Sequence, residues 1–113
     1  MWKRFAQVKL LGGLARRFHE RVQDAGILTP DGTFGIVSTG GLDERVFKFL
    51  IEHLAEGTWE LVCHPGYNDA DLRKVNTRLR ESRERELRLL GSAEARQLLA
   101  DNRIELISYN QLG

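Results

Sequence analysis

Apolar positions in the first 25 residues recur every three to four residues, the spacing of one face of a helix. Basic side chains fill many of the positions between them. The pattern predicts an amphipathic helix that covers the rest of the molecule, kinked at Gly12 and Gly13 and ended by Gly26. Its apolar positions are Phe5, Val8, Leu11, Ala15, Phe18 and Val22.

Three short segments rich in β-branched, aromatic and other apolar residues predict strands. The first runs from Thr33 to Thr39 after the turn sequence TPDG, and the second runs from Thr58 to His64 before Pro65. The second segment alternates only in part, which is typical of a strand covered on both faces of a parallel sheet. The third predicted strand runs from Ile104 to Tyr109.

Helical patterns separate these predicted strands. Apolar residues from Val46 to Leu54 mark one face of a helix that is opened by Asp43 and Glu44, where acidic residues suit the helix dipole, and stopped by Gly57. A charge-rich stretch over residues 72–90 predicts a loop followed by a helix, and Ser92 is the expected N-cap of a second helix. Helices therefore connect each predicted strand to the next.

This order predicts the α/β class, with one domain over residues 1–113 and a parallel sheet of about three strands joined by crossover helices. Three parallel strands are few, because both edges of the sheet expose backbone donors and acceptors. We therefore expect the sheet to belong to something larger, formed by a homodimer or by pairing with another segment.

Composition limits the class of protein. The 113 residues are 42% hydrophobic, enough for one core, and 17 Lys and Arg against 16 Asp and Glu give a net charge of +1, too balanced for a polyanion-binding tail. The single cysteine excludes an intramolecular disulfide and favours the reducing cytoplasm. No apolar run approaches the roughly 20 residues that span a bilayer, and we find no signal-peptide pattern.

His64 is the most informative side chain, because it ends a predicted parallel strand and precedes a Pro-Gly turn. Active sites of α/β proteins lie at this end of the strands. An imidazole there suits a general acid or an oxyanion stabiliser. The alternative is a histidine that caps a loop carbonyl. Cys63 precedes it and should point the opposite way as a buried, unreactive thiol.

The other histidines and the loop carboxylates are expected to have structural roles. His19 and His53 are expected on solvated helix faces, with no metal-ligand spacing around them. Turn or cap duty is expected for the loop carboxylates Asp31, Asp69 and Asp71.

The segment 73–88 contains seven basic residues against three acidic ones, and it supports a second functional hypothesis. The chain would then be a non-catalytic interaction module whose arginines bind a partner protein or nucleic acid. A solvated helix face is the competing interpretation, because Glu81, Glu84 and Glu86 are interspersed. Binding that weakens steeply as salt rises would identify phosphate contacts.

Three blocks of sequence carry a resemblance: GILTPDGTFGI at 26–36, ELVCHPGY at 60–67 and IELISYNQL at 104–112. In this order they resemble the C-terminal half of the YdjC-like carbohydrate deacetylases, which include chitooligosaccharide deacetylases and hopanoid-biosynthesis-associated members. REREL at 83–87 and GSAE at 91–94 resemble the helix pair that the family has between the last two blocks.

The resemblance implies the second half of a TIM-barrel-like (β/α) barrel of the polysaccharide-deacetylase type. It implies a hydrolase that removes the acetyl group from an N-acetylated sugar or oligosaccharide with a divalent metal, Mg²⁺ or Zn²⁺. His64 is then the catalytic residue, and Asp31, Gly66 and Tyr67 contact the substrate. The family's metal-ligating motifs have no counterpart in this sequence, so we expect no metal ligand on this chain and no turnover by the chain alone.

Overall fold

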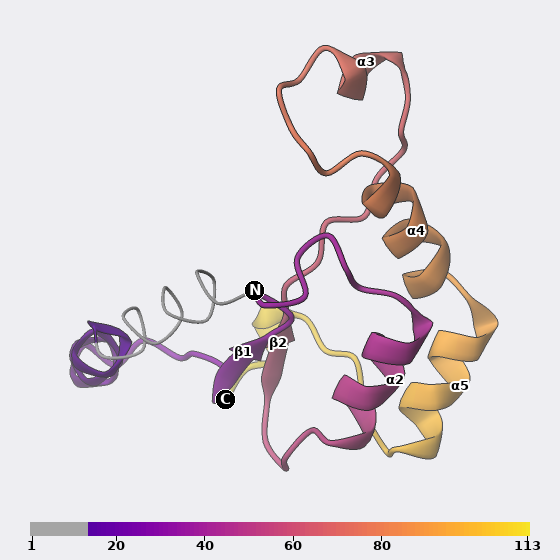
Figure 1. Cartoon of the computed structure of the whole chain (residues 1–113). Helices are drawn as coiled ribbons and strands as arrows, with labels where there is room; N and C mark the ends of the chain where they lie inside the picture. Colours follow the sequence, from indigo (N-terminus) through magenta and orange to yellow (C-terminus); the bar gives the residue numbers. More distant parts are fainter. Residues whose placement is uncertain (1–13) are drawn as a thin grey trace.

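The computed structural model describes residues 14–113, and its centre is a pair of parallel strands joined by a helix (Figure 1). Strand β1 spans Gly32–Phe34 and β2 spans Trp59–Leu61, with Gly32 opposite Trp59 and Phe34 opposite Leu61. The crossover helix α2 spans Glu44–Glu52. This β-α-β unit confirms the α/β class and the parallel direction of the first two predicted strands.

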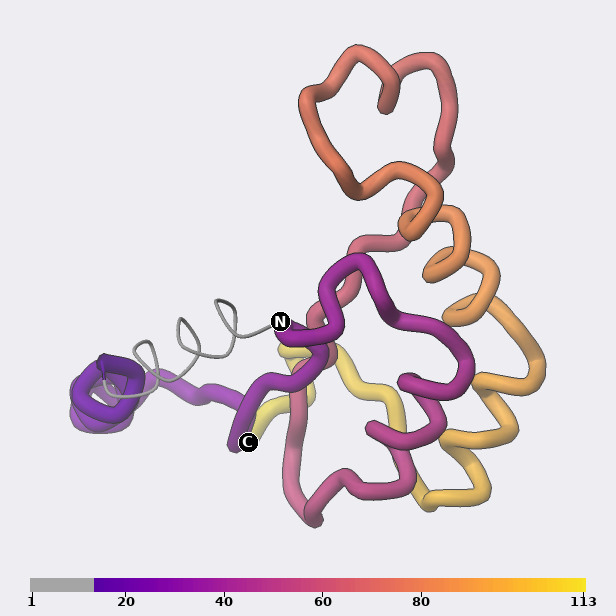
Figure 2. Tube along the Cα trace, in the orientation of Figure 1, coloured from indigo at the N-terminus to yellow at the C-terminus, as the bar shows by residue number. Residues whose placement is uncertain are grey.

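The remaining elements follow β2. Helix α3 spans Ala70–Arg73, α4 spans Glu81–Leu90, α5 spans Ala93–Asp101, and a 3₁₀ turn, η1, spans Tyr109–Gln111. The tube in Figure 2 shows that α2, α4 and α5 lie on one side of the two strands. None of the helices in residues 14–113 is long and apolar enough to cross a membrane.

Both strands are shorter than the sequence predicts. Strand β1 ends at Gly35, which has a φ of +92°, and a Cβ there would lie only 2.7 Å from the carbonyl oxygen of Val62. The backbone N–H of Val62 donates to the carbonyl of Phe34 at 2.9 Å, beyond which residues 36–40 turn away. A left-handed glycine at close approach therefore ends the ladder before Thr39.

The predicted third strand, Ile104–Tyr109, is wrong. Within the described residues the sheet contains β1 and β2 alone, and residues 104–108 are irregular. Ile104 packs against the core, whereas Leu106 is 77% exposed. Strand propensity reflects the packing of side chains on a sheet surface, and this segment does not pair with the sheet. The two strands form an open sheet, and they do not confirm the barrel-like resemblance.

The first predicted helix is confirmed over residues 14–24, and Gly26 follows it with a φ of +70°. The predicted kink at Gly12 and Gly13 lies outside the described residues. The covering role is wrong for the described part, because Leu14 is 64% exposed and Phe18 is 70% exposed. Figure 1 shows this helix away from the strands.

A small core joins helices α2, α4 and α5 to the strands. Leu42, Phe47, Ile51, Leu89 and Ala95 are buried, and Phe34 and Leu61 pack against them from the strands. N-caps position two of the helices: Asp43 accepts from the N–H of Val46 at 2.9 Å, and Ser92, the predicted N-cap, accepts from the N–H of Ala95 at 3.1 Å. Side-chain acceptors thus satisfy the first free N–H groups of α2 and α5.

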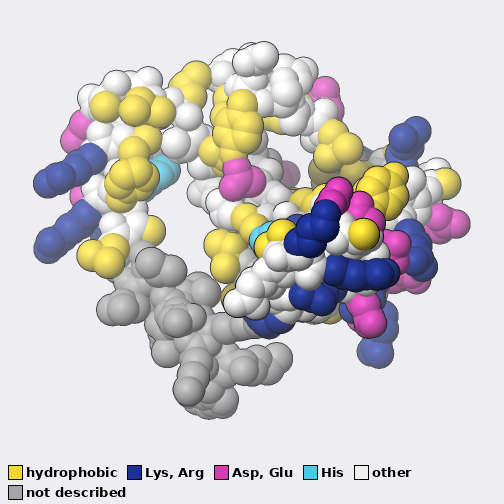
Figure 3. Space-filling view, turned by 90° about the horizontal axis from the view of Figure 1, so that it is seen from above, with side chains coloured by type: hydrophobic (Ala, Val, Ile, Leu, Met, Phe, Trp, Pro, Cys, Tyr) yellow, Lys and Arg dark blue, Asp and Glu magenta, His cyan; other side chains and the backbone are white. Residues whose placement is uncertain are grey.

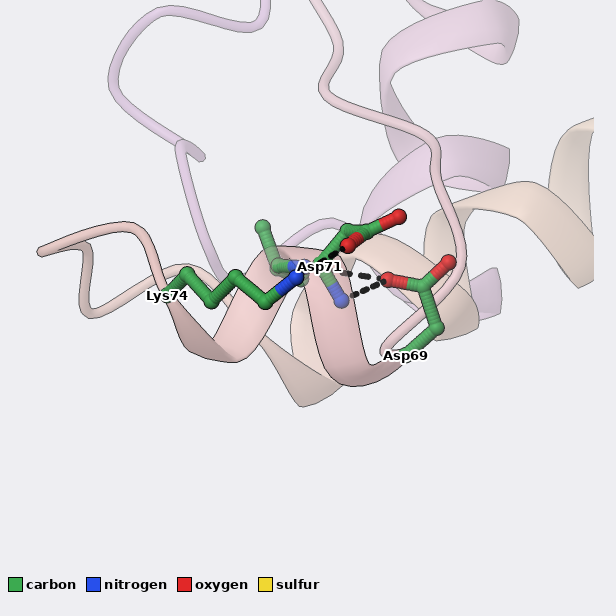
Figure 4. Close-up of polar contacts among 4 residues, drawn as sticks. Asp69, Asp71 and Lys74 are labelled. Carbon is green, nitrogen blue, oxygen red and sulfur yellow. Dashed lines mark hydrogen bonds and ion pairs between the residues drawn. The ribbon is translucent and has the colours of Figure 1, made fainter.

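Residues 67–80 form a loop that projects from the body at the upper end of the view in Figure 1. Within it, Asp69 caps α3 by accepting from the N–H groups of Asp71 and Leu72, at 3.1 and 3.0 Å, and Asp71 pairs with Lys74 at 2.8 Å (Figure 4). The cap duty expected of Asp69 is confirmed. The helix that follows begins at Glu81.

We predict that Asp43→Ala lowers the free energy of unfolding by about 1 kcal/mol, because the N–H of Val46 loses its acceptor. Urea denaturation followed by circular dichroism measures the change. Asp43→Asn keeps a side-chain acceptor and should retain most of the stability. An alanine variant as stable as the parent chain would show that this cap contributes nothing to the fold.

Candidate functional site

The His-Pro-Gly turn follows β2 and lies against helix α4. The backbone N–H of His64 donates to Oε2 of Glu86 at 2.5 Å, and the backbone N–H of Gly66 donates to the carbonyl of Arg83 at 3.1 Å. Residues 83 and 86 lie one turn apart on the same side of the helix. The Glu86 side chain and the Arg83 carbonyl, on one side of α4, therefore both hold the His-Pro-Gly turn.

The side chain of His64 is partly buried, and its Nδ1 atom has neither solvent contact nor a hydrogen-bond partner among residues 14–113. Over the same residues, neither ring nitrogen bonds a loop carbonyl, so the capping alternative is not observed. Nε2 is therefore the ring nitrogen that a substrate can reach.

Glu86 is the functional residue that sequence reasoning missed. Its exposed fraction is 2%, although it stands in a charge-rich segment and was expected on a solvated face with Glu81 and Glu84. The available signal was helical phase, because Glu86 lies three residues before the buried Leu89 and therefore on the inward side of α4. A carboxylate on an inward face requires a buried donor, which the turn supplies.

Cys63 packs against the core, as expected of a thiol that points away from the site. Burial raises the pKa of the Cys63 thiol above its ordinary value, and the negative charge of Glu86 raises it further. A raised pKa keeps the sulfur protonated at neutral pH, which is unsuited to a nucleophile. The structure therefore gives Cys63 a packing position beside the site.

Asp31 lies at the opposite end of the strands from His64. Its Oδ2 accepts from the N–H of Thr58 at 2.7 Å, and Asp31 and Thr58 precede the two parallel strands whereas His64 follows β2. A Cβ at Gly57 would lie 2.6 Å from this carboxylate oxygen, so glycine makes room for it. Asp31 therefore joins the starts of the two strands across 27 residues, in place of the local turn or cap contact expected of it, and the structure does not bring it together with the histidine.

Gly66 and Tyr67 do lie beside His64 along the turn. Tyr67 is 73% exposed at the start of the projecting loop, so its ring is open to solvent. Gly66 is partly buried against Arg83, through the backbone hydrogen bond described above. The roles of these residues, and of Asp31, in contacting substrate stay predictions.

Several basic side chains of the segment 73–88 have hydrogen-bond or ion-pair partners within the chain. Arg80 donates to the carbonyls of Thr77 and Val75, Arg83 donates to the carbonyl of Leu79, and Arg88 pairs with Glu84 at 3.1 Å. Figure 3 shows Lys and Arg side chains interspersed with Asp and Glu on one side of the molecule. This arrangement is typical of a solvated surface and does not favour a phosphate-binding module.

Among residues 14–113, no group of three or more His, Cys, Asp or Glu side chains is arranged to hold a metal ion. A cleft of about 580 Å³ lies between α2, α4 and α5, and charges of both signs line it, including Asp43, Arg45, Glu81 and Arg85. His64 and Tyr67 do not line this cleft. The described residues thus contain a strand-end histidine site without a metal-ligand cluster.

Comparison with protein families decides the classification. The model of the YdjC-like protein family matches residues 2–101. The chain belongs to the YdjC-like family. It is 32% identical over 103 residues to Carbohydrate deacetylase 1 of Listeria innocua, covering 88% of this chain and 42% of that protein. It is 29% identical over 93 residues to the Carbohydrate deacetylase of Thermoanaerobacter pseudethanolicus, covering 82% of this chain and 37% of that protein.

The Carbohydrate deacetylase of Vibrio cholerae is 32% identical to the chain over 108 residues, covering 88% of this chain and 42% of that protein. The chain thus spans about two fifths of the length of these curated relatives, and it matches their C-terminal part. No solved structure gives a significant match. The expected resemblance is confirmed at the level of the family.

We predict that alkylation of Cys63 by iodoacetamide is slow at neutral pH and accelerates only at a pH above that at which an ordinary cysteine titrates, because the thiolate is the reacting form. Glu86→Gln removes one cause of the raised pKa, so its rate profile should move to lower pH. Glu84→Gln is the control and should leave the profile unchanged. The prediction would be contradicted if the folded parent chain and the same chain unfolded in urea showed the same dependence of alkylation rate on pH.

Proposed function

We propose that this chain is the C-terminal part of a carbohydrate deacetylase that hydrolyses the acetamido group of an N-acetylated sugar. Membership of the YdjC-like family and the names of the curated relatives support the reaction class. The observation that carries the site assignment is the position of His64, at the carboxyl end of a parallel strand on a turn fixed by α4.

His64 acts as a general acid in this proposal. Water adds to the acetyl carbon, the C–N bond breaks, and the products are acetate and the free amine of the sugar. The protonated imidazole of His64 first stabilises the oxyanion of the tetrahedral intermediate through its Nε2–H and then gives this proton to the departing nitrogen, which leaves the neutral imidazole. The proton that the added water loses on forming acetate restores the starting state. Nε2 is the ring nitrogen that faces the substrate, because Nδ1 is buried.

Tyr67 and Gly66 provide the proposed substrate contacts. The exposed ring of Tyr67 offers an apolar face on which a sugar ring can stack, two residues beyond Pro65. Gly66, without a side chain, leaves room for the sugar beside His64. For Asp31 the proposed substrate contact rests on the family resemblance alone, because its carboxylate holds the loop at the other end of the strands from His64.

A divalent metal, Mg²⁺ or Zn²⁺, belongs to the proposal for the complete deacetylase, where it would supply an activated water. The described residues do not form a ligand set for it, so no step assigned to this chain passes through the ion. A cytoplasmic location, favoured by the single cysteine, is part of the same proposal.

The sheet and its surroundings require a further surface in the proposed enzyme. Apolar side chains near β1 are exposed, among them Ile27, Leu28, Ile36 and Val37. We propose that a second copy covers them when the chain is alone and that further strands cover them in the complete deacetylase.

We predict that His64→Ala slows deacetylation by about 10²- to 10⁴-fold, the usual contribution of a proton-transfer group. The assay measures acetate release from an N-acetylated oligosaccharide by this chain joined to the N-terminal part of the Thermoanaerobacter relative. Cys63→Ala is the matched control, because it should lower the melting temperature and leave the rate of the folded fraction nearly unchanged. Full activity of His64→Ala in a folded protein would refute the assignment.

We predict that the chain alone sediments as a dimer at high protein concentration, because exposed apolar residues beside β1 gain from burial. Ile36→Asp places a charge on this surface and should shift the equilibrium toward monomer. A monodisperse monomer for the parent chain would contradict the proposal and show that these side chains are stable in water.

A further inference from the structure

We infer that Glu86 is a positioning residue: its buried carboxylate fixes the backbone of His64 and thereby holds the imidazole at the end of β2. The inference rests on the proposed function for its catalytic consequence, whereas the geometry stands on this chain alone. Glu86 reaches the site from α4, 22 residues beyond His64 in the sequence. It is the largest fully buried side chain among the described residues.

Burial of a carboxylate is unfavourable unless nearby groups compensate its lost hydration. Among residues 14–113, no Lys, Arg or His lies within ion-pair distance of Glu86. The compensation that the structure shows is the hydrogen bond from the N–H of His64, at 2.5 Å. Hydrogen bonds to an ionised acceptor are short and roughly twice as strong as neutral ones. The carboxylate and the turn therefore stabilise each other.

The geometry restrains the turn on both sides of Pro65. Glu86 holds the residue before the proline, the carbonyl of Arg83 holds the residue after it, and the proline ring fixes its own φ. With the backbone fixed in this way, two side-chain torsions decide where the imidazole lies. Burial of Nδ1 restricts those torsions further, because one edge of the ring faces the protein interior.

The choice of a carboxylate matters physically. Glutamine at position 86 would keep the shape and offer a weaker, neutral acceptor, whereas leucine would leave the N–H of His64 without its partner. The charge also acts on Cys63, whose raised pKa reflects Glu86 as its second cause. Cys63 and His64, which follow β2, thus both respond to one side chain, and substitution of Glu86 must change both.

The first test measures the backbone of this chain by NMR. In the parent protein, a scalar coupling across the hydrogen bond should connect the amide nitrogen of His64 with the side-chain carboxyl carbon of Glu86. In Glu86→Gln the amide of His64 should exchange with solvent at least tenfold faster, whereas the amide of Gly66, held by Arg83, serves as the internal reference. Glu84→Gln, on the same helix, should change neither amide.

Absence of the coupling in the parent chain overturns the inference, as does unchanged exchange at His64 in Glu86→Gln. If Glu86→Gln does not fold, the parent coupling decides whether the hydrogen bond exists, and Glu86→Asp, which shortens the side chain, replaces it in the exchange measurement. These readouts require no activity, so they are independent of the proposed deacetylation.

The second test measures the catalytic consequence in the joined protein used for His64→Ala. Glu86→Gln should lower kcat by about tenfold to 100-fold and leave KM unchanged, because a misplaced acid affects the chemical step. Added to His64→Ala, it should cause no further loss. Equal losses with and without His64 would show a merely structural role. A joined protein with no deacetylase activity would refute the proposed function, while the NMR result would still decide the geometry.

Discussion

The hydrogen bond between the Glu86 carboxylate and the backbone of His64 is the interaction on which the site depends. It joins the end of β2 to α4, and the next turn of that helix places Leu89 in the core. A shift of α4 would expose apolar surface and would leave the buried carboxylate of Glu86 without its hydrogen-bond donor. Core packing and the position of the histidine are therefore parts of one arrangement, and a change in either one would be felt by the other.

Local signals predicted the helices well, because caps act within a few residues. Asp43 and Ser92 bond the N–H groups that their positions imply. Strands depend on distant partners, and here the sequence predicted too much: Gly35 ends β1 early, and Ile104–Tyr109 finds no edge to join. The helix over residues 14–24 shows the same limit of local signals. Its apolar stripe predicts that one face can be buried, but the stripe does not identify a surface against which that face packs.

The site was predictable in part. The position of His64 at a strand end followed from the order of elements, and its packed neighbour Cys63 followed from alternation along the strand. Glu86 was missed because charge composition treats every carboxylate of a helix as solvated, whereas the phase of α4 turns this one inward. Asp31 was grouped with the histidine by sequence resemblance, and the parallel direction of the strands separates them.

The projecting loop over residues 67–80 begins and ends beside the same stretch of α4, because Gly66 is bonded to Arg83 at its base. Because the loop is closed at its base, changes within it need not move the His-Pro-Gly turn. The entropic cost of closing such a loop rises only slowly with its length. Insertions and deletions beyond Tyr67 can therefore accumulate without disturbing the histidine. The turn held by Glu86 and Arg83 is thus followed by a segment whose length and sequence can change without moving His64.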